Sequence, residues 1–576
     1  MKKARLMLPL MLTVSTLAGC WGKVVEKFDP NKTQIKVNFF NGGYGVEWFM
    51  DLKEKFNSKS TKFQIIDDAE KREIVDITND IRTGNPKDDI YIAYGVNFQD
   101  AIYRDLLEDL SDVLEMKPDG ESGKTIREKM VDFDLWKSLA SKHGNGIYIL
   151  PHTQSLMGMV FDYQLFVDNN WLKAADSTDE EELTRQGIQF SKQSGKYKFV
   201  SSTSKTNYKS GDRILKAGKD GLFGTYDDGQ PTTMDEFDAL INQITGTNSS
   251  YSFIYSGKAE NYVNEFYASF IGQYIGAEDY RTLFDYNSKN TEIKMHNSTS
   301  KKITLENGYE IFKSEAVYQG LNFIEKYLAS SKVDPRVLSY YSYSHTDAQR
   351  DYIKDSQKDS KVPAFLIEGT WWENEAKFTG GYDSVPADWN YGKRDYRYLI
   401  TPSMEGQKTA SNKSCMGGME YQGIIVPKQN DPEKLQAIKE FLGMMNSDEN
   451  LINFTKKTGC KKYFKYDVPT DVYNSLTPFA RNNIEIMSDS EHIDVLPSRL
   501  YQASNPLTFA TSSYINDCFV PLYRETRTTN VLYPVRYFRD EVDVDELYST
   551  KSHWLGYSSS EWSQMLADVR SQGFFN

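Results

Sequence analysis

The chain has 576 residues, of which 39% are hydrophobic and 26% are charged, proportions that are ordinary for a globular protein and exclude disorder. The formal net charge of -13 at pH 7 argues against a nucleic-acid partner, because nucleic acid requires clustered Lys and Arg. Four cysteines and six histidines without close spacing exclude a disulfide framework and a Cys or His zinc site, although one disulfide between Cys415 and Cys460 stays open.

The first twenty residues read as an export signal. Lys2, Lys3 and Arg5 precede an apolar stretch over 6–14 that is too short to span a bilayer, and no later window is long enough. Small residues then lead to Cys20, and this Leu-Ala-Gly-Cys sequence resembles the bacterial lipobox. The resemblance implies that residues 1–19 are removed, that the Cys20 thiol takes a diacylglycerol, and that residues 20–33 form a tether at the extracellular face of the membrane. The alternative is an ordinary cleaved signal peptide that happens to carry a cysteine.

The next elements alternate between strands and helices. Apolar Ile35, Val37 and Phe39 alternate with polar residues and predict a strand over 34–40, which runs into a glycine-rich turn over 41–45. Phe49 and Phe56, with Leu52 between them, form one face of a helix, and further strands are predicted over 62–66 and 89–94. Strands alternating with helices favour a mostly parallel, doubly wound sheet, which binds ligands at the carboxyl ends of its strands.

Two later helices carry clear start signals. Asp431 followed by Pro432 predicts a helix start, and Ser558 with Glu561 has the spacing of a capping box. Each is followed by an apolar face, so both are expected to be plain core helices.

Seven segments together resemble the extracellular solute-binding proteins of bacterial ABC sugar transporters, the family that includes maltose-binding protein. In chain order they are 35–45, 88–93, 106–110, 147–151, 158–162, 363–372 and 423–427. The resemblance implies a type II periplasmic-binding-protein-like fold, in which two α/β lobes, each a mostly parallel sheet flanked by helices, are joined by a hinge. The expected boundaries are 34–152 for the first part of the N-terminal lobe, 153–416 for the C-terminal lobe with insertions, 417–505 for a return to the N-terminal lobe, and 506–576 for a C-terminal-lobe tail.

The implied function is capture of a carbohydrate, expected to be an oligosaccharide, by a monomer that closes about its hinge and delivers the sugar to a membrane permease. Sugars need hydrogen-bond partners for their hydroxyls and flat apolar surfaces for their rings, and the chain is rich in aromatic residues, at 14%. No catalytic residue is expected. The candidate ligand contacts are Tyr44, Trp48, Tyr94, Gln154, Tyr255, Trp371, Trp372 and Glu373, with Tyr262 as a weaker one.

These candidates each have a structural alternative. Trp48 is assigned to the cleft because it is placed off the core face of its helix, and otherwise it packs at the surface. One of Trp371 and Trp372 is expected to stack on a ring and the other to fill the core. Glu373 accepts ligand hydroxyls or forms a surface salt bridge, and Tyr255 could be buried.

The stretch over 220–229 contains Asp220, Asp227 and Asp228 among three glycines and predicts a loop that could hold a structural calcium ion, with Asp212 as a further ligand. The alternative is a turn with no ion, because Asp and Gly favour turns by themselves.

Two other functions stay open on sequence grounds. A surface glycoside hydrolase needs two opposed carboxylates, and no motif singles out such a pair. The same fold could also bind a non-sugar ligand such as a peptide or a polyamine.

Overall fold

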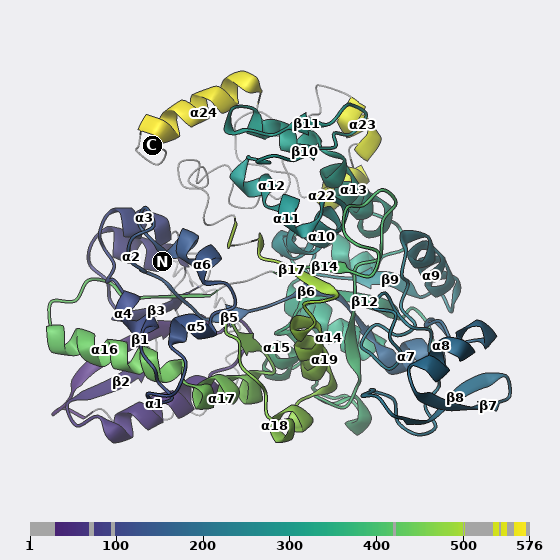
Figure 1. Cartoon of the computed structure of the whole chain (residues 1–576), viewed down its shortest axis with the longest axis horizontal. Helices are drawn as coiled ribbons and strands as arrows, with labels where there is room; N and C mark the ends of the chain where they lie inside the picture. The colour runs from purple at the N-terminus through teal and green to yellow at the C-terminus, as the bar shows by residue number, and fades with distance from the viewer. Residues whose placement is uncertain are drawn as a thin grey trace, which may run out of the picture.

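The computed structural model describes residues 29–67, 74–93, 98–418, 422–498, 500–501, 534–540, 543–549 and 558–571. The predictions for the signal peptide, for Cys20 and for Tyr94 lie outside these residues. The described chain forms two lobes, each built on its own sheet flanked by helices, as the sequence predicts (Figure 1). Both sheets are mixed and not mostly parallel as expected, because strands on the segments that cross between the lobes run antiparallel to their neighbours. Among the described residues, no helix is both long and apolar enough to cross a membrane.

The N-terminal lobe contains a five-stranded sheet in the order β2-β1-β3-β15-β4. Strand β1 pairs in parallel with β2 and β3, while β15 returns antiparallel between β3 and β4. The strands are β1 (Thr33–Phe39), β2 (Phe63–Asp67), β3 (Ile90–Ala93), β4 (Leu150–Pro151) and β15 (Gly423–Ile425). The helices are α1 (Glu47–Lys59), α2 (Ile74–Arg82), α3 (Phe98–Tyr103), α4 (Ser111–Leu114), α5 (Ile126–Lys129), α6 (Phe133–Ala140), α16 (Pro432–Met445) and α17 (Asp448–Thr458).

The C-terminal lobe contains a six-stranded sheet in the order β17-β14-β6-β12-β9, with β13 also pairing with β6. These strands are β6 (Met157–Asp162), β9 (Tyr251–Ile254), β12 (Pro363–Gly369), β13 (Tyr396–Leu399), β14 (Ser414–Gly417) and β17 (Ile493–Leu496). Its larger helices are α9 (Met234–Gly246), α10 (Glu260–Ile275), α13 (Glu315–Phe323), α14 (His345–Asp355) and α19 (Pro478–Ser488). Shorter helices are α7 (Tyr163–Asp168), α11 (Ala277–Tyr280), α12 (Thr282–Asp285), η2 (Leu305–Lys313), η3 (Ile324–Leu328), η4 (Pro335–Leu338), α15 (Trp372–Phe378), η5 (Ala387–Trp389) and α18 (Thr470–Ser475), and a small hairpin joins β10 (Glu292–Ile293) to β11 (Lys301–Lys302).

The chain crosses between the lobes three times. It first leaves the N-terminal lobe through β4 and β5 (Thr153–Gln154) into β6, and it returns from β14 to β15. The third crossing begins at β16 (Lys461–Lys462), which pairs antiparallel with β5. The β5–β16 ladder therefore joins two of the three crossing segments, and any hinge motion must bend it.

The boundaries expected for the return segment are wrong at their C-terminal end. Residues 417–505 were expected to lie entirely in the N-terminal lobe, but β17 pairs in parallel with β14, and α19 contacts β13. The apolar pattern of these elements does not reveal which sheet they join, because that depends on long-range pairing.

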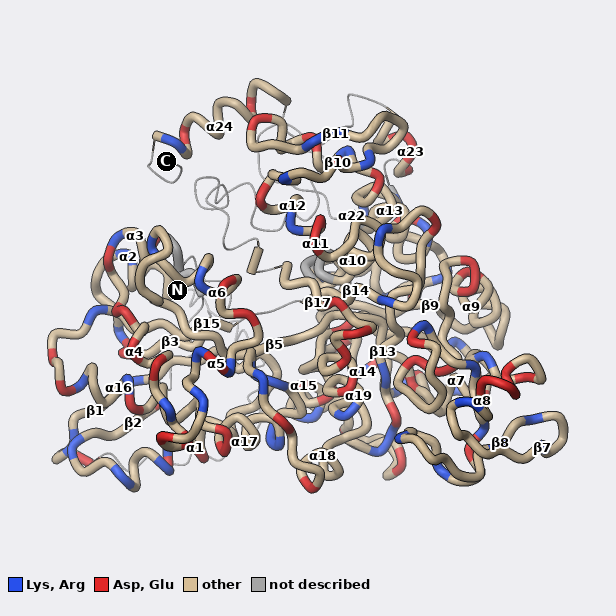
Figure 2. The backbone as a smooth tube through the Cα atoms, viewed as in Figure 1, with Lys and Arg blue, Asp and Glu red and all other residues tan. Residues whose placement is uncertain are grey.

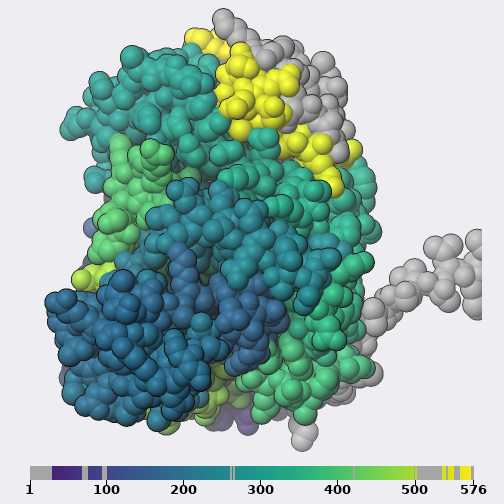
Figure 3. Space-filling model, turned by 90° about the vertical axis from the view of Figure 1, so that its right-hand side faces the viewer, coloured from purple at the N-terminus to yellow at the C-terminus, as the bar shows by residue number. Residues whose placement is uncertain are grey.

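Residues 170–235 contain a small unit with its own apolar core. It contains η1 (Ser177–Asp179), α8 (Glu180–Arg185) and the hairpin of β7 (Ile188–Gln193) and β8 (Lys196–Ser202), around a cluster that includes Leu183, Tyr197 and Phe199. In Figure 3 this unit, in blue, protrudes at the lower left of the C-terminal lobe, and the C-terminal helices, in yellow, lie at the top.

The C-terminal helices contact the C-terminal lobe. They are α22 (Pro534–Asp540), α23 (Val544–Ser549) and α24 (Ser559–Ser571), and they contact η3, α13 and η2, respectively. The predicted capping box of α24 is confirmed, since the Glu561 amide donates to Ser558 Oγ at 3.2 Å and Glu561 Oε2 accepts from the Ser558 amide at 2.9 Å. The predicted start of α16 is confirmed too, because Asp431 accepts from the Glu433 amide at 2.9 Å.

Candidate ligand-binding site between the lobes

The glycine loop that follows β1 meets the C-terminal lobe at α15. Gly42, Gly43 and Gly45 all have positive φ, at 54°, 80° and 78°. A Cβ atom added to Gly43 would lie 2.9 Å from Cδ1 of Trp371, and the Gly43 carbonyl accepts from Asn374 Nδ2 at 2.9 Å. The loop therefore needs glycine both for its backbone conformation and for its close approach to the opposite lobe.

Tyr44 joins this loop to the first crossing segment. Its side chain is 3% exposed, and its hydroxyl forms a 2.8 Å hydrogen bond with Ser155 Oγ. Gln154, the preceding residue, is half-buried. It lies opposite Lys461 in the β5–β16 ladder, which we call the hinge ladder. Both predicted contacts therefore lie where the lobes join.

The expected position of Trp48 is wrong. Trp48 is 5% exposed and packs between Phe454, at a ring-centroid distance of 5.3 Å, and His152, at 4.9 Å. It precedes Leu52 by four residues, so it belongs to the buried face of α1 and not to its polar face.

Trp371 and Trp372 face different environments. Trp371 is 3% exposed and lies at the seam between the lobes, which we define as the place where the glycine loop over 41–45 approaches Trp371. Its ring is edge-on to Tyr262 at 6.1 Å, and Tyr262 stacks on His345 at 5.4 Å. Trp372 is fully buried and packs against Tyr396 at 5.0 Å. Of the pair, Trp371 therefore lies where the lobes meet, and Trp372 lies in the core of the C-terminal lobe.

Glu373 is buried within the C-terminal lobe, so the alternative of a surface salt bridge is wrong. Its carboxylate accepts from Thr477 Oγ1 at 2.5 Å and from the Gly392 amide at 3.3 Å. Burial raises the pKa of Glu373 to about 7. The hydrogen bond from Thr477 thus joins Glu373 of α15 to the start of α19.

Tyr255 follows β9 and is fully buried, with its hydroxyl donating to the Leu328 carbonyl at 2.7 Å. This hydrogen bond ties the end of β9 to η3, so the structural alternative, core packing, accounts for Tyr255.

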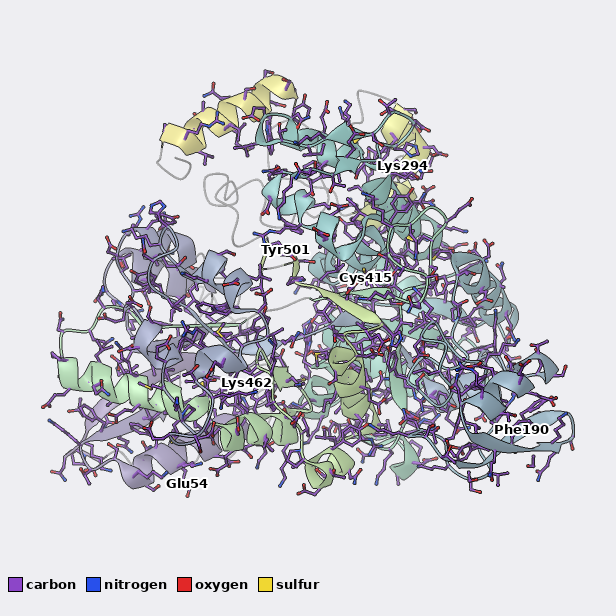
Figure 4. The ribbon with its side chains drawn as sticks, in the orientation of Figure 1. Glu54, Phe190, Lys294, Cys415, Lys462 and Tyr501 are labelled. Atoms are coloured by element: carbon purple, nitrogen blue, oxygen red, sulfur yellow. The ribbon has the colours of Figure 1, made fainter. Side chains whose placement is uncertain are left out.

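Three partly or largely exposed aromatic residues were not among the sequence-predicted candidates. Phe40 is 43% exposed and lies at the carboxyl end of β1, beside the glycine loop, and Tyr341 is 80% exposed beyond η4. Tyr501 follows β17 and faces the other lobe (Figure 4). Burial raises the pKa of Tyr501, the charge of Arg281 opposes this rise, and the carboxylate of Asp132 in the N-terminal lobe adds to it. The sequence did contain a signal for Phe40. It is an apolar residue at a position where the alternation of β1 predicts a polar one.

Several buried polar atoms around the crossing segments have no protein partner. They lie on side chains from both lobes and from the segments between them: His152 Nδ1, Thr153 Oγ1, Thr370 Oγ1, Asn374 Oδ1 and Gln422 Oε1. A buried polar atom without a hydrogen bond costs about 1–3 kcal/mol. Both donors and acceptors are present, which matches the hydroxyl groups of a polyhydroxylated ligand.

The carboxylates of the 220–229 loop do not form the expected calcium site. Asp228 accepts from the Gly224 amide at 2.7 Å and from Tyr208, and Asp227 accepts from Thr225 Oγ1 at 2.9 Å. Within the described part of the chain, no group of three or more His, Cys, Asp or Glu side chains is arranged to hold a metal ion. Hydrogen bonds within the turn account for these residues, and burial together with the charge of Asp220 raises the pKa of Asp227 to about 7.

Cys415 and Cys460 are both free and buried, so the disulfide that stayed open is not formed. In Figure 2, the positions of Lys and Arg, in blue, and of Asp and Glu, in red, are interspersed along the backbone of both lobes.

Comparison with solved structures identifies the fold. The chain is similar to a chitin oligosaccharide binding protein, with 12% identity, a TM-score of 0.53, and coverage of 90% of this chain and 100% of that one. It is also similar to a putative binding protein, MsmE, from Bacillus subtilis, with 12% identity, a TM-score of 0.50, and coverage of 95% and 100%. A third similar structure is the bacterial solute receptor AcbH, which prefers β-D-galactopyranose, with 11% identity, a TM-score of 0.50, and coverage of 94% and 98%. No protein-family model and no curated protein sequence matches the chain. The chain therefore has the two-lobed α/β fold of these binding proteins.

Proposed function

We propose that this protein is the lipid-anchored substrate-binding component of an ABC transporter, which captures a carbohydrate, expected to be an oligosaccharide, between its lobes. The observation that carries the proposal is the meeting of the glycine loop with Trp371 across the seam. A ligand held there contacts both lobes at once, so its binding free energy depends on the angle between them.

The side chains at the seam suit a sugar. Trp371 and Tyr262 offer aromatic faces or edges to a ring, and Phe40 adds an exposed ring at the end of β1. Thr153, Thr370 and Gln422 have polar atoms that need partners. A polyhydroxylated ring meets both requirements, because its C–H face is apolar and its hydroxyls donate and accept.

The lipid on Cys20 and a membrane permease complete the proposal. A tether of about a dozen residues holds the two lobes near the membrane surface, where a permease binds the closed form. Metabolic labelling with a palmitate analogue tests the anchor, and a Cys20→Ser variant that still incorporates the label contradicts it.

A thermal-shift screen against a panel of oligosaccharides tests the binding function. We expect at least one sugar to raise the melting temperature of the protein, and Trp371→Ala to reduce that shift strongly. Phe190→Ala is the matched control, because Phe190 lies on β7, in the separate unit far from the seam (Figure 4). No shift with any sugar, an equal loss in both variants, or hydrolysis of a panel sugar contradicts the proposal.

A further inference from the structure

A lysine is buried in the hinge ladder without an acidic partner. Lys462 is the last residue of β16 and is 1% exposed. Figure 4 shows it at the junction between the lobes. Its ammonium group forms no ion pair with any described residue, and its one side-chain hydrogen bond is to Asn446 Oδ1 at 3.4 Å. A buried ammonium group in such surroundings is costly, because few dipoles replace its lost water.

The elements around Lys462 contribute mostly aromatic rings, whose weak attraction for a cation replaces only part of the hydration that Nζ loses on burial. From α1 and α17, the rings of Trp48 and Phe454 each lie 5.7 Å from Nζ. From the first crossing segment comes His152, which is 1% exposed and whose Nδ1 has no partner. Burial and the nearby charge of Lys462 hold the pKa of His152 well below its usual value, so this imidazole stays neutral.

The charged groups nearby are already paired with one another. Lys129 of α5 donates to the Asn446 carbonyl at 3.2 Å and to Asp448 at 2.8 Å, and it also pairs with Asp119. These two carboxylates therefore offset the charge of Lys129. Tyr466 beyond β16 accepts from the Lys462 backbone amide at 3.1 Å.

We propose that Lys462 makes the hinge sensitive to protonation, such that a charged Lys462 loosens the β5–β16 ladder and a neutral Lys462 keeps it packed. The protonated Nζ is more stable in water than in the packed ladder, and separation of β16 from α1 and α17 admits water to it. Separation breaks the pairing of Lys462 with Thr153 and the bond from the Tyr463 amide to the His152 carbonyl, which measures 3.3 Å. Both strands belong to crossing segments, so the lobes become freer to part.

The pH range of this effect follows from the burial of the group. Burial lowers the pKa of Lys462 from 10.5 to about 7. The packed ladder therefore binds fewer protons than the loosened one, and its stability falls as the pH falls from the ordinary lysine range through about 7. One titrating group changes such an equilibrium by at most about tenfold per pH unit.

Hydrogen exchange measured by mass spectrometry tests the proposal without any sugar, so its failure is separate from a failure of the proposed function. After correction for intrinsic exchange, peptides covering 152–154 and 461–463 should exchange several-fold faster at pH 6 than at pH 8.5. The variant Lys462→Met should lose most of this pH dependence. Lys465→Met is the matched control, because Lys465 is an exposed lysine three residues away, and it should retain the dependence in full.

A second substitution guards against misfolding of the methionine variant. Lys462→Gln keeps a donor for Asn446 but carries no charge, and it should also lose the pH dependence. The proposal is overturned if either folded variant exchanges with the same pH dependence as the unmodified protein. It is equally overturned if the unmodified protein shows none.

Discussion

Substitution of Gly43 by alanine tests the contact between the lobes directly. At φ 80°, an alanine is strained by about 1–2 kcal/mol wherever the lobes lie. The new Cβ would also come within 2.9 Å of both Trp371 Cδ1 and Glu375 Cβ. Overpacking of this kind costs about 1–3 kcal/mol, and parting of the lobes relieves it.

The two costs can be separated with a matched variant. Gly84 beyond α2 has a similar φ of 68°, but nothing lies within 4 Å of its added Cβ. Gly84→Ala should therefore lower the stability of the protein by about as much as the backbone strain in Gly43→Ala. Only Gly43→Ala should also weaken ligand binding, by roughly 5-fold to 150-fold for the overpacking cost.

Isothermal titration calorimetry with a sugar selected by thermal shift measures both affinities. Urea denaturation of the unliganded variants measures the backbone strain. If Gly43→Ala and Gly84→Ala bind the sugar with equal affinity, the glycine loop does not approach Trp371 in the liganded form, and the reasoning fails.

Three further outcomes follow from the buried groups. Trp372→Ala should lower the free energy of unfolding by about 3–5 kcal/mol in urea denaturation, because Trp372 is fully buried, and a loss below 1 kcal/mol contradicts that packing. Burial raises the pKa of Glu368 to about 8 and of Glu373 to about 7. Below about pH 4.5 the folded protein therefore has the full stability that the two protonated carboxyls contribute. This contribution is lost as the pH rises through 7 to 8. Glu373→Gln should flatten that fall between pH 5 and pH 8.5, and an unchanged slope counts against the assignment. A chelator should leave the melting temperature unchanged, since hydrogen bonds hold the 220–229 loop, and a clear drop restores the calcium interpretation.

Local patterns in the sequence predicted the first strands, the glycine loop and the two capped helices. Alternation fixed β1, and the glycines at 42, 43 and 45 indicated a conformation that other residues rarely adopt. Asp431 and Ser558 marked helix starts because a capping side chain acts within three residues. All of these features depend on neighbours in the chain.

The errors arose where distant segments decide the outcome. Whether Trp48 lies in the core depends on α17, which is about 400 residues further along the chain. The partner of β17 is likewise set by tertiary pairing with β14. The sequence around Tyr501 did not indicate that it faces the N-terminal lobe, because only the fold brings it towards Asp132. In the 220–229 loop, both the turn and the calcium interpretations use the same residues, so composition could not separate them.

Small-angle X-ray scattering tests the central claim most directly. The protein is measured alone and then saturated with the sugar that gives the largest thermal shift. Capture between two hinged lobes predicts a smaller radius of gyration in the presence of the sugar, and a smaller change in Trp371→Ala at the same sugar concentration. A radius that stays unchanged when the sugar is bound at saturation contradicts the account.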